Sequence, residues 1–275
     1  MAYRTLLRYA TSQGIRYGAW FSFFLFGVLG AIGERAFTTI LSPRYGDAAP
    51  WLMAMLLWGA LRWATWLPDR MLAAAGRPWL IVLLASIEQA IRIGGGLVLV
   101  RVWGAPGLVA AYGAGLLFRA TLARRLAGRA LVQARIYIWQ VLIAPAGGAI
   151  LTYQMLRIVL IYLWPATASS ATWGGGALLA VGLLLPSLWI YGFLTALLGG
   201  WDDGVLAELQ EATAISSIGF PAAWVLVQSI RLGARISPLH GRYPIALYAL
   251  AQDEAHALTL AQRQAETIID TERSA

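Results

Sequence analysis

The sequence predicts an all-α, polytopic integral membrane protein: a bundle of six transmembrane helices, or seven, followed by a cytoplasmic amphipathic C-terminal helix. Of its 275 residues, 59% are hydrophobic and only 12% are charged, whereas soluble domains carry about 25% charged residues. The mean hydropathy is +0.66, and the apolar residues gather in long stretches that suit a lipid environment. These features exclude a soluble enzyme, a disulfide-stapled secreted module and a disordered tail.

Six stretches approach the roughly 20 apolar residues that a membrane-spanning helix needs. They are Gly18–Leu41, Trp51–Leu67, Trp79–Val100, Gly107–Leu122, Ile136–Trp164 and Gly176–Gly199. The fourth is short, and we expect it to continue beyond Leu122. A seventh stretch, Ala214–Ile230, is uncharged but interrupted by Pro221. It either spans the membrane, re-enters it or lies along its surface.

The arginines predict the orientation. One side of this arrangement collects ten of them, at positions Arg4, Arg8, Arg16, Arg70, Arg77, Arg119, Arg124, Arg125, Arg129 and Arg135, and the other side has three, Arg35, Arg44 and Arg101. Because positive charge favours the cytoplasmic side, we expect a multi-pass protein of the cell membrane with its N-terminus in the cytoplasm. A seventh span would place Arg231, Arg235 and Arg242 outside, which favours six spans.

The chain therefore divides into four parts. They are a basic cytoplasmic N-terminus (1–17), the transmembrane bundle (18–200), an acidic linker that includes the seventh stretch (201–242) and a polar tail (243–275). Within the tail, Ile245–Ile269 predicts an amphipathic helix. Its apolar face would hold Leu247, Leu250, Leu258 and Ala261, with Asp253, Glu254 and Arg263 elsewhere.

Charged residues within the predicted spans are the candidate functional residues. Each costs roughly 2.5–3.5 kcal/mol in the bilayer centre, so such residues usually face a bundle interior or a wet cavity. The candidates for substrate binding are Arg62, Glu88, Gln89, Arg92, Tyr153 and Arg157. Two interpretations remain open. In the first, Glu88 pairs with Arg92, four residues later, while Arg62 and Arg157 reach toward the membrane–water interface. In the second, an aqueous cavity with excess positive charge binds a phosphate or pyrophosphate.

The sequence offers little for catalysis, metals or cofactors, and we expect none of these. Cysteine is absent, and the two histidines, His240 and His256, lie near the C-terminus. Hydrolase, metalloprotease and phosphate-loop motifs are missing. An acidic cluster comprises Asp202, Asp203, Glu208 and Glu211, which could hold Mg²⁺ but more often forms a solvated cap at a helix N-terminus. The net charge of +8 fits the membrane better than a nucleic-acid partner.

Three segments follow one another in a recognisable order. They are Ile40-Leu-Ser-Pro-Arg-Tyr-Gly-Asp-Ala-Ala-Pro50, Met71-Leu-Ala-Ala-Ala-Gly-Arg-Pro78 and Arg101-Val-Trp-Gly-Ala-Pro-Gly-Leu-Val-Ala-Ala-Tyr112. Over residues 18–125 this series resembles the C-terminal half of the polysaccharide flippases of the multidrug/oligosaccharidyl-lipid/polysaccharide (MOP) exporter superfamily. The resemblance lies in the order of the turns rather than in a single specific motif.

The resemblance implies a six-helix bundle that forms one of two pseudo-symmetric halves around a central cavity. It also implies alternating-access transport of lipid-linked sugars, with cationic cavity residues near the lipid pyrophosphate. A full family member has twelve or more spans, and this chain has half as many. We therefore expect membrane lipids and either a second half-transporter subunit or a second copy as partners. The alternative is a non-transporting structural subunit of a larger membrane complex.

Overall fold

A computed structural model describes residues 4–36, 47–133, 135–168, 173–215, 220–243, 248 and 250–261, and within them the structure is helical, without β-strands. The helices, in order, are α1 (Arg4–Ala36), α2 (Ala49–Ala60), α3 (Trp63–Ala74), α4 (Pro78–Trp103), α5 (Ala105–Ala130), a π-helical turn (Trp139–Ile143), α6 (Ala144–Ala168), α7 (Trp173–Leu197), α8 (Asp203–Ile215) and α9 (Phe220–Ile236). The predicted helical membrane protein is thus confirmed in outline. Four helices in the described part are long and apolar enough to cross a membrane: Arg4–Gly33, Pro78–Trp103, Ala105–Ala130 and Trp139–Leu163.

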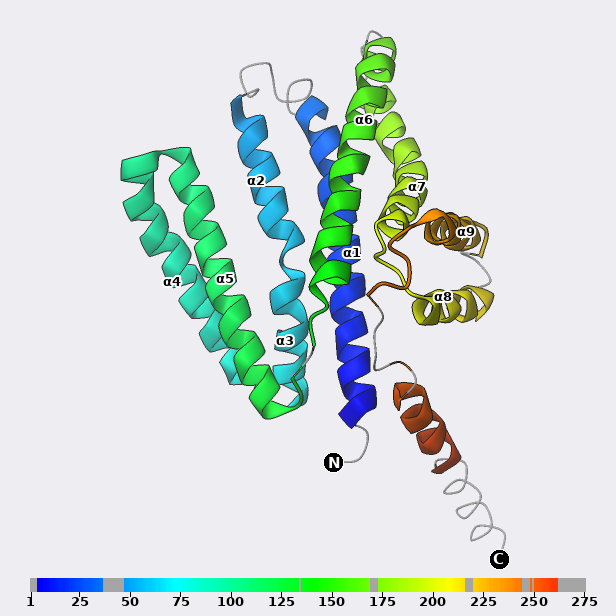
Figure 1. The fold of residues 1–275 in the computed structure, drawn as a ribbon. Coiled ribbons are helices and arrows are strands. Elements are labelled where there is room, and N and C mark those ends of the chain that lie inside the picture. Colours follow the sequence, from blue (N-terminus) through cyan, green and yellow to red (C-terminus); the bar gives the residue numbers. More distant parts are fainter. Residues whose placement is uncertain are drawn as a thin grey trace, which may run out of the picture.

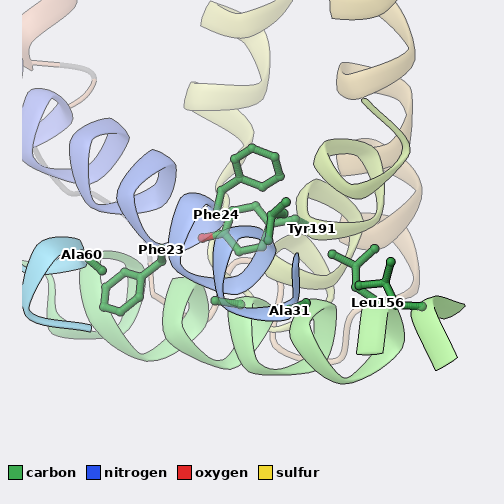
Figure 2. Close-up of a cluster of buried hydrophobic side chains, with 9 residues drawn as sticks. Phe23, Phe24, Ala31, Ala60, Leu156 and Tyr191 are labelled. Atoms are coloured by element: carbon green, nitrogen blue, oxygen red, sulfur yellow. The ribbon is translucent and has the colours of Figure 1, made fainter. Parts of the chain in front are cut away.

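Helix α1 lies at the centre of the molecule, beside α6, with α7 on one side and α2 and α3 on the other (Figure 1). The main core forms where α1 meets α2, α6 and α7, and Figure 2 shows Phe23 and Phe24 of α1 within it, with Tyr191 of α7. Phe23 and Tyr191 are at most 1% exposed. The Tyr191 hydroxyl donates to the carbonyl of Trp20 at 2.8 Å, which fixes α7 to α1.

The second predicted span is divided into α2 and α3. The division falls at Leu61 and Arg62, where the backbone amides bond to carbonyls three and four residues earlier. The chain is therefore kinked rather than interrupted, and its amides remain satisfied. Pro68 lies inside α3, where a proline removes one helical hydrogen bond. The predicted second span, Trp51–Leu67, is thus formed by two shorter helices, neither of which is among the four that are long enough to cross a membrane alone.

Helices α4 and α5 form an antiparallel hairpin at one edge of the molecule, packed on α3 (Figure 1). The turn between them falls between the third and fourth predicted stretches, which end at Val100 and begin at Gly107. Gly104 has a φ of +64°, in the left-handed region that favours glycine. A Cβ at Gly107 would lie 2.3 Å from the carbonyl oxygen of Leu99, so glycine permits the close return of α5. As expected, the fourth apolar stretch continues beyond Leu122.

Helices α8 and α9 run across the direction of α1, α6 and α7 (Figure 1). The described part of the seventh apolar stretch includes most of α9, which packs against α7 through Ile230, a fully buried residue. On its other side, α9 exposes Trp224 and Leu232. This crosswise placement differs from that of the long apolar helices and suits a helix lying along a surface.

The described part of the C-terminal tail is helical over residues 250–261. Ala251 is buried, whereas Leu250, which was predicted to pack, is 57% exposed. Glu254 points instead toward the start of α1, where its carboxylate accepts hydrogen bonds from the amides of Thr5 at 3.3 Å and Leu6 at 2.7 Å. The rest of the predicted amphipathic helix, including Arg263, lies outside the described residues.

Candidate functional site: two charged networks inside the helices

The first network joins α3, α4 and α5 around Glu88, whose side chain is 1% exposed. Arg92 donates to one of its carboxylate oxygens, as the spacing of four residues predicts. Arg119 donates to the other at 2.6 Å, and through its second nitrogen to Asp69 of α3 at 2.6 Å. The Arg92 guanidinium also lies 3.7 Å from the centre of the Tyr112 ring.

This network is electrically balanced, because two carboxylates face two guanidinium groups. The excess positive charge that an anion-binding interpretation requires is therefore not found around Glu88 and Arg92. Pairing lets these charges lie inside a helical hairpin, since a buried charge is tolerated when paired and hydrogen-bonded. These ion pairs hold α3 against the α4–α5 hairpin. The predicted role of Glu88 and Arg92 in substrate binding stays a prediction.

Sequence reasoning missed Arg119 and Asp69. It assigned Arg119 to the cytoplasmic flank of the fourth span, whereas α5 extends to Ala130 and places Arg119 near its middle. A signal was present in the hairpin itself. Glu88 lies sixteen residues before the turn at Gly104 and Arg119 fifteen residues after it, and such residues face each other across an antiparallel hairpin.

The other candidate residues do not join this network. Arg62 is exposed at the kink between α2 and α3, and Gln89 is exposed on α4. On α6, Tyr153 is partly buried against the main core, while Arg157 is exposed. The six predicted residues therefore do not line one shared cavity within the described chain.

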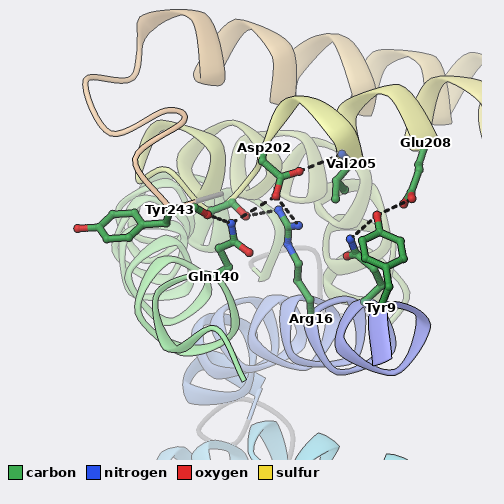
Figure 3. Close-up of polar contacts among 9 residues, drawn as sticks. Tyr9, Arg16, Gln140, Asp202, Val205, Glu208 and Tyr243 are labelled. Carbon is green, nitrogen blue, oxygen red and sulfur yellow. Dashed lines mark hydrogen bonds and ion pairs between the residues drawn. The ribbon is translucent and has the colours of Figure 1, made fainter. Parts of the chain in front are cut away.

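The second network surrounds Arg16 of α1, which is 2% exposed and was also predicted to be a flanking residue. As Figure 3 shows, its guanidinium points toward the chain segment that precedes α8. It donates to the carbonyl of Gly200 at 2.5 Å and lies 3.5 Å from a carboxylate oxygen of Asp202. The Trp201 ring centre is 5.1 Å from the guanidinium carbon. A single buried arginine thus holds the segment after α7 against α1.

Asp202 and its neighbours extend this network. The other carboxylate oxygen of Asp202 accepts from the amide of Val205 at 3.0 Å, which confirms the predicted acidic cap at the N-terminus of α8. We expected this cap to be solvated, but Asp202 also faces the buried Arg16 (Figure 3). From α8, Glu208 accepts a hydrogen bond of 2.5 Å from the Tyr9 hydroxyl of α1. Gln140 donates to the carbonyl of Tyr243, which brings in the start of the tail.

Neither network has the composition of a metal site. No group of three or more histidine, cysteine, aspartate or glutamate residues that could hold a metal ion occurs among the residues that the structure describes. His240 lies 3.0 Å from Asp203, and this pair alone is too small for such a site. Comparisons with models of protein families, with curated proteins and with solved structures find no match for this chain.

Proposed function

We propose that the chain is a half-sized, flippase-like membrane transporter subunit that moves lipid-linked saccharide, or a similar anionic amphiphile, across the cell membrane by alternating access. The observation that carries this proposal is the exposure of polar side chains within an apolar helix. Arg157 lies in the candidate span Trp139–Leu163, six residues before its end, and both it and Gln154, one turn earlier, are exposed on the single chain. Around them, Ile158 and Met155 are 57% and 46% exposed.

A position of this kind is costly in a bilayer. An arginine in a spanning helix costs up to roughly 2.5–3.5 kcal/mol when it is surrounded by lipid, the full amount applying at the bilayer centre. Facing a water-filled path between two subunits would remove most of this cost. In a half-sized transporter, the residues of such a path are exposed on the isolated chain and covered only by the second half. The polar stripe on α6, formed by Gln154 and Arg157, is exposed on the single chain, as this arrangement requires.

The kinked second helix supports the same proposal. In this proposal α2 and α3 cross the membrane together as the second span, and α7 as the sixth. Discontinuous helices are common at the sites of transporters, where they allow one part of the bundle to move against another. Arg62 is exposed at this kink. Under the orientation predicted from the arginines, the N-terminus would lie in the cytoplasm.

The second candidate function is that of a structural subunit in a larger membrane complex, without transport of its own. The balanced charges around Glu88 and the tight contacts of Arg16 favour it, because both networks serve to fix helices in place. Under this alternative, unrelated subunits would cover the exposed face of α6. The chain would then co-purify with them and move no lipid alone.

Transport can be tested with purified protein in phosphatidylcholine vesicles that contain a fluorescent disaccharide linked to an isoprenyl diphosphate. Its movement between leaflets is measured by quenching from outside with a membrane-impermeant reagent. We expect the native protein to move it, and Arg157→Ala and Arg62→Ala to abolish movement without loss of folding. The matched control is Arg77→Ala, since Arg77 is exposed at the start of α4. Absence of transport by the folded native protein, or unchanged transport in both variants, would refute the proposal.

A further inference from the structure

A cavity of about 660 Å³ lies between α1, α3, α5 and the segment that follows α5. This volume falls within the roughly 300–1,000 Å³ of small-molecule sites. One wall is basic and consists of Arg124, Arg125 and Arg129 of α5. The facing wall, from α3, is apolar and includes Leu67 and Met71.

The basic wall has the chemistry of an anion site. Aspartate and glutamate are absent from the described residues that line the cavity. Arg125 and Arg129 form no ion pair with any residue that the structure describes. Guanidinium forks match the oxygen atoms of a phosphate.

A second, smaller cavity of about 200 Å³ adjoins the first and is lined entirely by apolar residues. The two cavities share walls formed by Trp63, Ala64, Ala120 and Ile136. From the shared walls, the smaller cavity continues along Leu116 of α5. A ligand that fills both cavities therefore needs an anionic head and an apolar chain.

We propose that these two cavities form a binding site for an anionic phospholipid, with its phosphate head group between Arg125 and Arg129 and part of an acyl chain against Ala120. The end of α5 that carries these arginines lies at the same end of the molecule as the start of α1 (Figure 1). Under the predicted orientation this is the cytoplasmic leaflet, where anionic lipids attract basic pockets between helices. This inference does not depend on transport, because a resident lipid would equally stabilise a structural subunit.

The first test measures lipid binding to the detergent-solubilised full chain. The chain is titrated with phosphatidylglycerol or phosphatidylcholine, and native mass spectrometry detects the bound lipid. We expect preferential retention of phosphatidylglycerol. Each arginine near a lipid phosphate contributes about 1 kcal/mol, or roughly a five-fold change in affinity. The double variant Arg125→Gln/Arg129→Gln should therefore bind phosphatidylglycerol about 25-fold more weakly. Arg77→Gln removes an exposed arginine outside the cavity and should bind as the native chain does.

Equal binding of the two lipids, or native affinity in the double variant, would overturn the proposal. A competition experiment distinguishes a lipid site from a site for a free anion. Inorganic phosphate and glycerol phosphate should displace phosphatidylglycerol only weakly, because they cannot fill the apolar cavity. If either competes as well as the lipid itself, the site belongs to a soluble anion and the proposal fails.

A variant of the shared wall tests the acyl-chain position. Ala120→Leu adds volume where the two cavities meet, and it should weaken the binding of long-chain phosphatidylglycerol more than that of a short-chain analogue. Equal weakening of both would contradict the proposed chain position. If this variant fails to fold, Leu116→Trp fills the smaller cavity alone and is judged by the same comparison.

Discussion

The charge network around Glu88 allows a sharp test of the packing between α3 and the α4–α5 hairpin. Glu88→Gln keeps the shape of the side chain but removes the negative charge that faces both Arg92 and Arg119. Removing one partner of a buried ion pair typically costs about 3–5 kcal/mol, because the remaining charge is left without compensation. Since Glu88 is 1% exposed and serves two arginines, we expect a loss of stability within this range.

The assay is equilibrium unfolding of the purified chain in detergent micelles, followed by circular dichroism. Gln89→Ala is the matched control, because Gln89 is the next residue on α4 and is exposed; it should change the free energy of unfolding by no more than about 0.5 kcal/mol. The double variant Glu88→Leu/Arg92→Leu should recover part of the loss, since Arg119 keeps Asp69 as its partner. A loss below about 1 kcal/mol for Glu88→Gln, at the level of an ordinary neutral hydrogen bond, would refute the buried network.

Three further predictions concern other contacts. Gly233→Ala should destabilise the packing of α9 on α7 by about 1–3 kcal/mol, because its Cβ would lie 2.4 Å from a carbonyl oxygen of α7. The Cβ of Gly94→Ala would meet no atom beyond its own helix within 4 Å, so this variant should be at least as stable as the native chain, since alanine favours a helix over glycine by about 0.5–1 kcal/mol. Equal thermal stability of the two variants would contradict the packing. Arg16→Leu should detach the segment before α8 and increase amide hydrogen exchange around Asp202. Unchanged exchange there would refute the inference that Arg16 holds this segment against α1. Hydrogen bonds from the first turn of α1 hold the pKa of the Glu254 carboxyl below its ordinary value of 4.5, so its contribution to tail docking is present above that pH and is lost as the pH falls through the lowered pKa. Proteolysis of the tail should therefore rise at acidic pH in the native chain, whereas in Glu254→Gln it should already be raised at neutral pH. A native pH profile of proteolysis in this variant would contradict the contact.

Much of the fold could be predicted because hydrophobic length and turn residues are local properties of the sequence. The hairpin around Gly104 and the pairing of Glu88 with Arg92 depend on residues close together in the chain, and both were found. The partners of Arg16 could not be found in this way. They lie about 184 residues away, at Gly200 and beyond, and only the tertiary fold brings them together.

The error over Arg119 has a different cause. The positive-inside rule counts arginines near the ends of spans, and the predicted end of the fourth span at Leu122 placed Arg119 in that region. The helix continues to Ala130, so Arg119 lies near its middle, where Glu88 and Asp69 of the neighbouring helices pair with it. The kink at Arg62 also escaped prediction, although Gly59 precedes it by three residues and Pro68 follows within α3.

The central claim is that the polar stripe on α6 faces a water-filled path, and thiol labelling tests it most directly. The chain contains no cysteine, so Gln154→Cys and Met155→Cys each introduce one thiol into the same turn of α6. In membranes that contain the native assembly, we expect a membrane-impermeant maleimide to modify the cysteine at 154 rapidly. The cysteine at 155 lies about 100° around the helix from 154, outside the polar stripe, and should react slowly. Equal protection of both positions would show that the stripe is dry and would contradict the proposed path.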